Sequence, residues 1–430
     1  MKTSPLIIGS FSKMYLLIFG FFGIILLNSC RSSETPSQNN EGPSTIVGTY
    51  FESPLEYSAG KNPIDLALGD FNSDNQTDIL VTSPKKQDGV NNIDDGTMIL
   101  FQRDSSSSSS KFPYISSIIE PEVAEWRQDL VVFDFSGDNV SDLIFTHTNE
   151  ASIKFFKNNG SFNFSENGSV TVGEAPINIE TGDWNGDNQT DIAVVNRDNN
   201  SVSVIYNSSG LFSISQNLSV NEKPVKITSG DWNNDTYMDL AVLSRNSNLV
   251  QILINNGSGF FNISDTTISV GSFPVDMIAG DWNCDSKIDL AVTNSGEDTL
   301  SLIFGKGTGS FDSPIKILTG RGPRSIVSAD FNGDSKLDFV IGHQFFVMTP
   351  GLPLLTGDFS LTLSDENYSN GYSNPISFAI SLSDRGNAPG ELVITYVDND
   401  SKLDILATVP SSKQLVLISG KQFSGSLSCP

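Results

Sequence analysis

Aspartate and asparagine recur at fixed spacing in seven short segments of the chain. The clearest reads DWNGDNQTD from Asp183, with oxygen-bearing side chains at positions 1, 3, 5 and 9. Hard cations such as Ca²⁺ bind six to eight oxygen ligands from carboxylates, amide carbonyls, main-chain carbonyls and water. Alternate spacing turns such side chains toward one point, and Gly, Asn or Ser at positions 4 and 6 permits sharp curvature. Because three carboxylates this close would otherwise repel one another, we predict a calcium ion in each complete loop.

These acidic loops supply a large set of candidate metal ligands. They are Asp70, Asn72, Asp74, Asp78, Asp134, Ser136, Asp138, Asp142, Asp183, Asn185, Asp187, Asp191, Asp231, Asn233, Asp235, Asp239, Asp281, Asn283, Asp285, Asp289, Asp330, Asn332, Asp334, Asp338, Asp398, Asp400 and Asp404. The second loop has a poorer ligand, Ser136, at position 3, and Tyr396 replaces the first aspartate of the seventh loop. We therefore expect about six Ca²⁺ ions, or about seven if the last loop binds despite Tyr396.

Two other interpretations of the acidic loops are weaker. An EF-hand requires glutamate at position 12 and flanking helices, whereas position 12 of the third loop is Val194, inside a strand-like run. Asp and Asn also form ordinary turns that bind no metal. Near-identical repetition of the same oxygen spacing favours metal binding over simple turns.

The loops recur at intervals of about fifty residues, which is typical of a repeat array. Each repeat contains four short apolar runs bounded by Gly, Asn or Ser, as expected for four antiparallel strands. Four strands per repeat predict an all-β, seven-bladed β-propeller. The last repeat ends before its fourth strand, while Phe51 to Ser58 resembles the outer strand that begins at Phe311. We therefore expect strands from both termini to close the ring in the seventh blade.

An aromatic residue occupies position 2 of six loops. These residues are Phe71, Phe135, Trp184, Trp232, Trp282 and Phe331. At a fixed position beside buried strands, they are expected to pack between neighbouring blades rather than to stack against sugars.

The N-terminal region has the features of an export signal. Lys2 and Lys13 precede a short apolar stretch, Met14 to Leu27, which is too short for an ordinary membrane span. The following LNSC resembles a bacterial lipoprotein box in which Cys30 is lipidated; an uncleaved anchor or an ordinary secretory signal remain the alternatives. We assign residues 1–29 to the signal peptide, 30–45 to a flexible tether and 46–430 to the propeller.

Charge and cysteine content narrow the possible partners. A net charge of -25 with only 25 basic residues argues against nucleic acid as a ligand. Beyond Cys30 the chain has Cys284 and Cys429, and with so few cysteines we expect no disulfide.

No catalytic residues stand out. The two histidines, His147 and His343, follow equivalent strands of blades two and six, and we expect them to be independent of each other. The sequence contains no G-x-S-x-G elbow, H-E-x-x-H helix or phosphate-binding loop.

The acidic loop, its GDFN or GDWN lead-in and the glycine-rich turn before phenylalanine resemble FG-GAP or VCBS repeats, the blades of the integrin α-chain propeller. The resemblance implies a calcium-binding propeller, and such propellers serve as adhesion heads, lectins or appendages of enzymes. We expect a monomeric, exported lipoprotein, at the bacterial cell surface or in the periplasm and anchored to the membrane only through its N-terminal lipid. It would be a non-catalytic module that binds a protein or glycan; the alternative is an exported polysaccharide lyase or hydrolase.

The ligand-binding surface is predicted on the face opposite the acidic loops. That face would receive an insertion in blade one, SPKKQDGVNNIDDG, the link EPEVAEWRQ before blade two, and a long segment from Asp365 before blade seven. Trp126, Tyr368 and Tyr372 would provide aromatic anchors there. The alternative is that these segments are neutral insertions.

Overall fold

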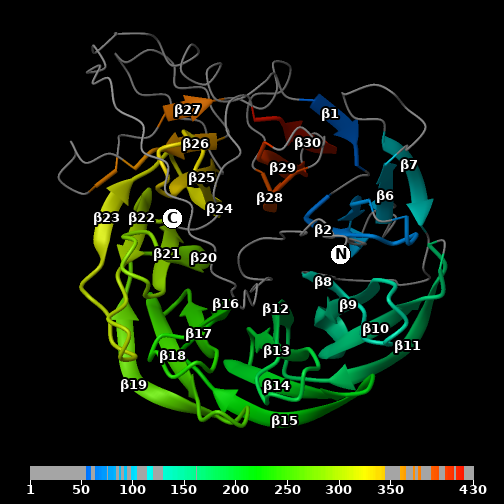
Figure 1. Ribbon diagram of the computed structural model, residues 1–430, viewed down its shortest axis with the longest axis horizontal. Coiled ribbons are helices and arrows are strands. Elements are labelled where there is room, and N and C mark those ends of the chain that lie inside the picture. The colour runs from blue at the N-terminus through cyan, green and yellow to red at the C-terminus, as the bar shows by residue number, and fades with distance from the viewer. Residues whose placement is uncertain are drawn as a thin grey trace, which may run out of the picture.

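The structure is a closed ring of seven four-stranded antiparallel sheets, which confirms the predicted seven-bladed β-propeller (Figure 1). The computed structural model describes residues 55–59, 63–74, 76–83, 87–88, 92–93, 98–103, 114–119, 129–160, 162–343, 359–364, 371–372, 376–378, 389–396, 402–410 and 413–420. The only helical element within these residues is a short 3-10 turn, η2 (Thr148–Glu150).

Each blade is a meander that begins at the centre of the ring. Blades one to three consist of β2 (Asp65–Gly69), β3 (Asp78–Thr82), β6 (Met98–Arg103) and β7 (Tyr114–Ile119); β8 (Leu130–Phe133), β9 (Asp142–His147), β10 (Ser152–Asn158) and β11 (Phe164–Thr171); β12 (Pro176–Gly182), β13 (Asp191–Asn196), β14 (Ser201–Ser208) and β15 (Leu211–Ser219). The hairpin of β4 (Gln87–Asp88) and β5 (Asn92–Ile93) lies in the predicted blade-one insertion.

The remaining blades repeat this order. Blades four to six consist of β16 (Pro224–Gly230), β17 (Asp239–Ser244), β18 (Leu249–Asn255) and β19 (Phe261–Ser269); β20 (Pro274–Gly280), β21 (Asp289–Asn294), β22 (Thr299–Ile303) and β23 (Ile315–Leu318); β24 (Pro323–Ala329), β25 (Asp338–His343), β26 (Phe359–Thr362) and β27 (Ile376–Phe378). Blade seven contains β28 (Leu392–Thr395), β29 (Asp404–Val409), β30 (Gln414–Ile418) and, from the other end of the chain, β1 (Leu55–Ser58).

The closing strand is the one that the sequence predicts. β1 pairs antiparallel with β30, from Leu55 opposite Leu417 to Ser58 opposite Gln414. Because β30 would otherwise present an unpaired edge, strands from both ends of the chain complete the seventh sheet. This arrangement joins the first and last repeats into one ring.

The core lies between blades rather than within any single blade. Both faces of a blade are covered by its neighbours, so second strands such as β13 are buried along their whole length and read as continuous apolar runs. Trp184 and Val204 of blade three, for example, pack with Ile227 and Phe261 of blade four. Burying such apolar surface stabilises each interface by roughly 25 cal/mol per Å². The position-2 aromatics are all buried, which confirms their predicted packing role.

Candidate metal centre

The ninth position of every acidic loop is the first residue of the second strand of its blade. The residues at this position are Asp78, Asp142, Asp191, Asp239, Asp289, Asp338 and Asp404, each with 0% of its surface exposed. One carboxylate of each predicted ligand set is therefore fixed by the sheet, while the others lie in the loop.

In blades three to five, the ninth-position carboxylate joins three segments of its blade. Asp239 accepts the N–H of Trp232 on Oδ2 at 3.3 Å and the N–H of Asn255, at the end of the third strand, on Oδ1 at 2.8 Å. The corresponding pair of bonds recurs at Asp191 and Asp289. The acidic loops and the turns between third and fourth strands therefore lie on one face of the ring, as predicted.

The earlier positions of a loop curl inward around its main-chain N–H groups. In the third loop, Asp183 accepts the N–H of Gly186 at 2.8 Å and of Asn188 at 2.8 Å. Asn185 accepts the N–H of Asp187 at 2.9 Å. Gly186 and Asn188 both have positive φ, 78° and 62°, a conformation that Gly and Asn tolerate best. The small residues at positions 4 and 6 thus permit the tight curve that the sequence predicts.

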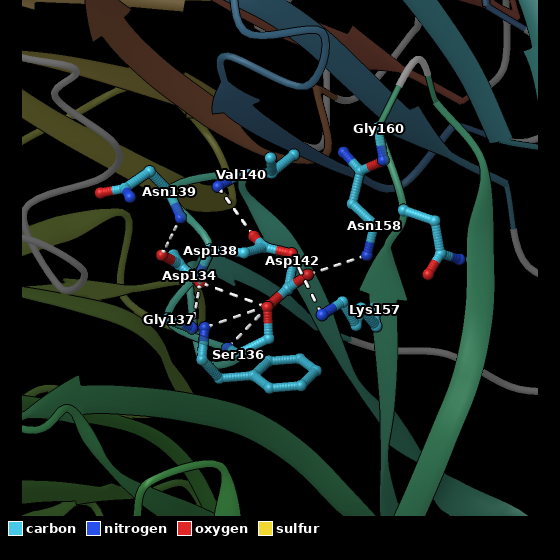
Figure 2. Close-up of polar contacts among 12 residues, drawn as sticks. Asp134, Ser136, Gly137, Asp138, Asn139, Val140, Asp142, Lys157, Asn158 and Gly160 are labelled. Carbon is cyan, nitrogen blue, oxygen red and sulfur yellow. Dashed lines mark hydrogen bonds and ion pairs between the residues drawn. The ribbon is translucent and has the colours of Figure 1, made fainter.

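The second loop contains a basic group that the sequence analysis missed. Figure 2 shows Asp134, Asp138 and Asp142 on one side of Lys157, whose ammonium lies 3.1 Å from Oδ2 of Asp138. Although burial acts to raise the pKa of Asp138, the bond from Lys157 lowers it overall. Tyr206 and Ile254 stand at the equivalent place before the turn in blades three and four. A lysine at a position where these other blades have Tyr or Ile was the sequence signal that could have revealed the contact. Only the folded third strand, however, brings Lys157 next to the loop.

Burial and mutual repulsion act on the ninth-position carboxylates. Burial, followed by the charges at positions 5 and 1 of the same loop, raises the pKa of Asp191, Asp239 and Asp289 to about 7. The pKa of Asp338 is raised to about 8 for the same reasons. The carboxylates of one loop are thus close enough to influence each other electrostatically.

The donor chemistry of the loops suits a hard cation, although the carboxylates are not gathered into a cage. Within the described parts of the chain, no three carboxylate, imidazole or thiol groups already form a cluster that could hold a metal ion. Carboxylate and amide oxygens that accept one N–H retain a second lone pair, so the side chains keep capacity for a cation. Asp398 and Asp400 of the seventh loop lie outside the described residues.

The loops also tie neighbouring blades together. The carbonyl of Trp184 accepts the Nδ2 amide of Asn255, in the next blade, at 3.0 Å. Asn158 makes the same bond to the carbonyl of Phe71 at 2.9 Å. A change in loop conformation therefore acts directly on an interface between blades.

The predicted aromatic patch on the opposite face is not supported at Tyr372. This residue is only 5% exposed and packs against Phe339 in the core between blades five and six. Tyr372 forms an isolated β-bridge with Ser364, and Ser364 donates its N–H to Asp338 at 2.7 Å. This bond places the connection on the acidic-loop face. The prediction treated the segment from Asp365 as a link before blade seven. It was wrong because the segment begins as the connection between β26 and β27, within blade six. Trp126 and Tyr368 lie outside the described residues.

The two histidines belong to separate blades, and both are buried. His147 in β9 accepts the N–H of Glu150 at 3.3 Å, whereas Nε2 of His343 in β25 lies 2.8 Å from the Ser360 hydroxyl. Burial lowers the pKa of His343 to about 4. The two side chains have separate partners, and a shared acid–base pair has no support.

Replacing His343 with asparagine is expected to reduce acid sensitivity. The unfolded chain takes up a proton on histidine below about pH 6.5, the folded chain only below about pH 4. The contribution of neutral His343 to the free energy of unfolding is therefore fully present above about pH 6.5. It is lost as pH falls toward about 4, by roughly 3 kcal/mol in total. Asn196 and Asn294 occupy the equivalent site and donate to Ser203 and Ser301, so asparagine should fit. Urea unfolding at several pH values would measure the difference, and equal losses in both proteins would contradict it.

Cys284, at position 4 of the fifth loop, is disulfide-bonded, and its partner lies outside the described residues. The expectation of no disulfide was therefore wrong. The reasoning applied to small scaffolds with many cysteines, whereas a single bridge depends on which distant segments the ring brings together.

Fold and loops together define a seven-bladed β-propeller with an acidic loop between the first and second strands of its blades. Comparison with known families identifies its repeats. The model of the FG-GAP-like repeat matches residues 134–194, 183–242, 231–292 and 281–341, so this part of the propeller consists of four FG-GAP-like repeats.

Several solved structures are similar to the chain at low sequence identity. BBS1N in complex with ARL6DN, soaked with lead, is 11% identical with a TM-score of 0.56, covering 87% of this chain and 98% of that one. The mercury-soaked form is 12% identical with a TM-score of 0.56, covering 86% and 97%. A Lactobacillus plantarum protein is 14% identical with a TM-score of 0.48, covering 74% and 85%. No curated protein sequence matches the chain.

No helix in the described residues has the length and apolar character needed to cross a membrane.

Proposed function

We propose that the chain is a calcium-binding propeller, tethered to the cell surface, that acts as a non-catalytic module for binding a protein or glycan. The observation that carries the calcium proposal is the repeated loop, in which a fully buried ninth-position aspartate lies beside two further acidic positions. Asp239, for example, experiences the charges of both Asp231 and Asp235.

The side chains at positions 1, 3, 5 and 9 would hold the ion in each loop. Bound calcium would neutralise the carboxylates and hold the loop against the second strand. Elemental analysis and calcium titration of the purified protein should find about six ions per chain. The second loop should bind more weakly than the third and fourth, because Ser136 is a poorer ligand and Lys157 already pairs with Asp138. Absence of bound calcium at millimolar concentration would reject the metal proposal in favour of simple turns.

A binding role is supported by what is known of the fold. Two similar structures with TM-scores above 0.5 are of BBS1N in complex with another protein, ARL6DN. Loops on a rigid scaffold are where binding residues commonly lie. A glycan array and a pull-down with purified protein would test this role, alongside a screen for polysaccharide cleavage. Cleavage without retention of any ligand would favour the alternative, an exported lyase or hydrolase.

Export and lipid attachment at Cys30 are part of the proposal, although Cys30 lies outside the described residues. The disulfide at Cys284 supports export, because disulfides persist mainly in oxidising compartments. Lipid chains would supply the anchoring energy. In a chain with three cysteines, a lipidated Cys30 leaves Cys429 as the disulfide partner of Cys284.

Cys30→Ser is expected to release the protein from the membrane fraction, because the lipid-bearing sulfur is lost. Cell fractionation would measure the change, and non-reducing peptide mapping would identify the partner of Cys284. Unchanged membrane association of the variant, or a bridge between Cys284 and Cys30, would show that the lipid assignment is wrong.

A further inference from the structure

A group of arginines lies on the face opposite the acidic loops. Arg197 directly follows β13 and Arg245 directly follows β17, and both strands run from an acidic loop to this opposite face. Arg324 is the second residue of β24, which runs in the other direction and so begins on the same face. The same face also carries carboxylates, among them Asp198, Glu297 and Asp298, so it matters which arginines these carboxylates pair with.

The two equivalent turns treat their arginines differently. In blade three, Asp198 lies 2.9 Å from both Nε of Arg197 and Nζ of Lys223, and so forms ion pairs with both. In blade four the residue after Arg245 is Asn246, which carries no charge. Within the described residues Arg245 has no ion pair with a carboxylate. The pKa of Arg245 is lowered, first by burial and then by the positive charges of Arg324 and Arg197.

Arg245 is held instead against an exposed aromatic ring. Its Nε donates to the carbonyl of Pro274 at 3.3 Å, and its guanidinium lies 4.9 Å from the centroid of Phe273. Arginine on an aromatic face forms a cation–π contact, and the planar guanidinium keeps further N–H donors available. The Phe273 contact therefore orients Arg245 without neutralising it.

Phe273 is itself an unusual residue for its place. It is 53% exposed and has a φ of 53°, in the left-handed region that bulky residues rarely adopt. Ala175, Lys223 and Gly322 occupy the equivalent place before the first strands of blades three, four and six, with similar φ values. The left-handed backbone is therefore a feature of the repeat, and only the bulky exposed side chain of Phe273 distinguishes blade five. An exposed phenylalanine at this position provides an apolar ring face beside the unneutralised guanidinium.

We propose that Arg245 and Phe273 form a binding site for a carboxylate group of an acidic glycan, with Arg324 adding positive charge on the same face. Guanidinium groups bind carboxylates through paired N–H bonds, and an aromatic ring offers a flat apolar surface to the C–H face of a sugar. The exposed ring favours a uronate sugar over an acidic peptide, because a peptide carboxylate needs only the charge. This inference rests on the proposed binding function and assigns it a ligand class and a face.

Titration calorimetry of the calcium-loaded mature protein with glucuronate-containing hexasaccharides tests the site. Asn246→Asp gives Arg245 the counter-ion that Arg197 already has, and should weaken binding about tenfold while leaving the fold intact. Arg245→Gln should weaken it at least as much. Lys306→Gln is the matched control, because it removes one positive charge from an exposed pair with Asp312 on the acidic-loop face. Its affinity should equal that of the wild type.

The same hexasaccharides with carboxylates reduced to hydroxymethyl groups should not bind. Equal binding of reduced and native sugars, or wild-type affinity in both Asn246→Asp and Arg245→Gln, would overturn the proposal. Binding of a polyglutamate peptide without binding of the glucuronate sugars would also overturn it. If no glucuronate sugar binds but a neutral glycan or a protein is captured, this site is refuted while the proposed binding function stands.

Discussion

Removing calcium with a chelator is expected to lower the melting temperature of the protein by about 10 °C or more. A ligand present at 100 times its dissociation constant stabilises the native state by about 2.7 kcal/mol per site, and several loops should contribute. Without the ion, the burial and the repulsion that together raise the pKa of Asp239 to about 7 are no longer balanced. Because Trp184 of one loop is bonded to Asn255 of the next blade, loosened loops should also weaken blade interfaces.

Calorimetric melting in calcium and in EDTA would measure this effect. Asp235→Asn should remove about one bound ion and reduce the difference between the two melting curves, since it takes one carboxylate from the fourth loop. Asp265→Asn, on the exposed part of β19, removes the same charge outside any loop and should change neither quantity. Identical melting curves for the wild type in calcium and EDTA would reject a stabilising ion.

Deleting the chain through Ser58 is expected to open the ring and cause self-association. The deletion removes β1, leaves the edge of β30 unpaired and takes Tyr57 away from Phe101, with which it makes an edge contact at 5.9 Å. Loss of the strand pairing and this packing should lower the free energy of unfolding by about 5 kcal/mol. An unpaired strand edge is a template for pairing with another chain. Light scattering after size-exclusion chromatography, with thermal melting, would measure both effects.

A shorter deletion that ends at residue 50 is the matched control. It keeps β1 and should leave stability and oligomeric state unchanged. Adding a synthetic peptide of residues 51–58 to the longer deletion should restore the closed form, because the peptide can pair with β30. A monomer of normal stability after the longer deletion would contradict the proposed role of β1 in closure.

Most of the fold could be predicted because the informative signals repeat at a fixed period. The aspartate that starts every second strand fixes the register of each blade, and the aromatic at position 2 fixes its packing against the next. The resemblance of Phe51 to Ser58 to another outer strand was enough to predict closure. These features depend on residues close in sequence or on equivalence between repeats.

The remaining features depend on differences between repeats, which periodicity does not register. Lys157 reaches Asp138 only when the third strand is folded beside the loop. Tyr372 enters the core because blade six has an unusual connection before β27. Arg245 occupies the same position in its repeat as Arg197, which is paired with Asp198. Arg245 lacks such a pair because its neighbour is Asn246, and it lies instead over the ring of Phe273, in the link before blade five.

The position of β1 has a mechanical consequence. Any pulling force transmitted through the N-terminal segment enters the ring at Leu55. This residue is the first of β1, the strand that pairs with β30 and completes blade seven. The load is therefore borne first by the pairing of β1 with β30, whereas the other blades are joined along continuous chain. Resistance of the ring to such a force therefore begins at one short strand pair, supported by the packing of blade one against blade seven.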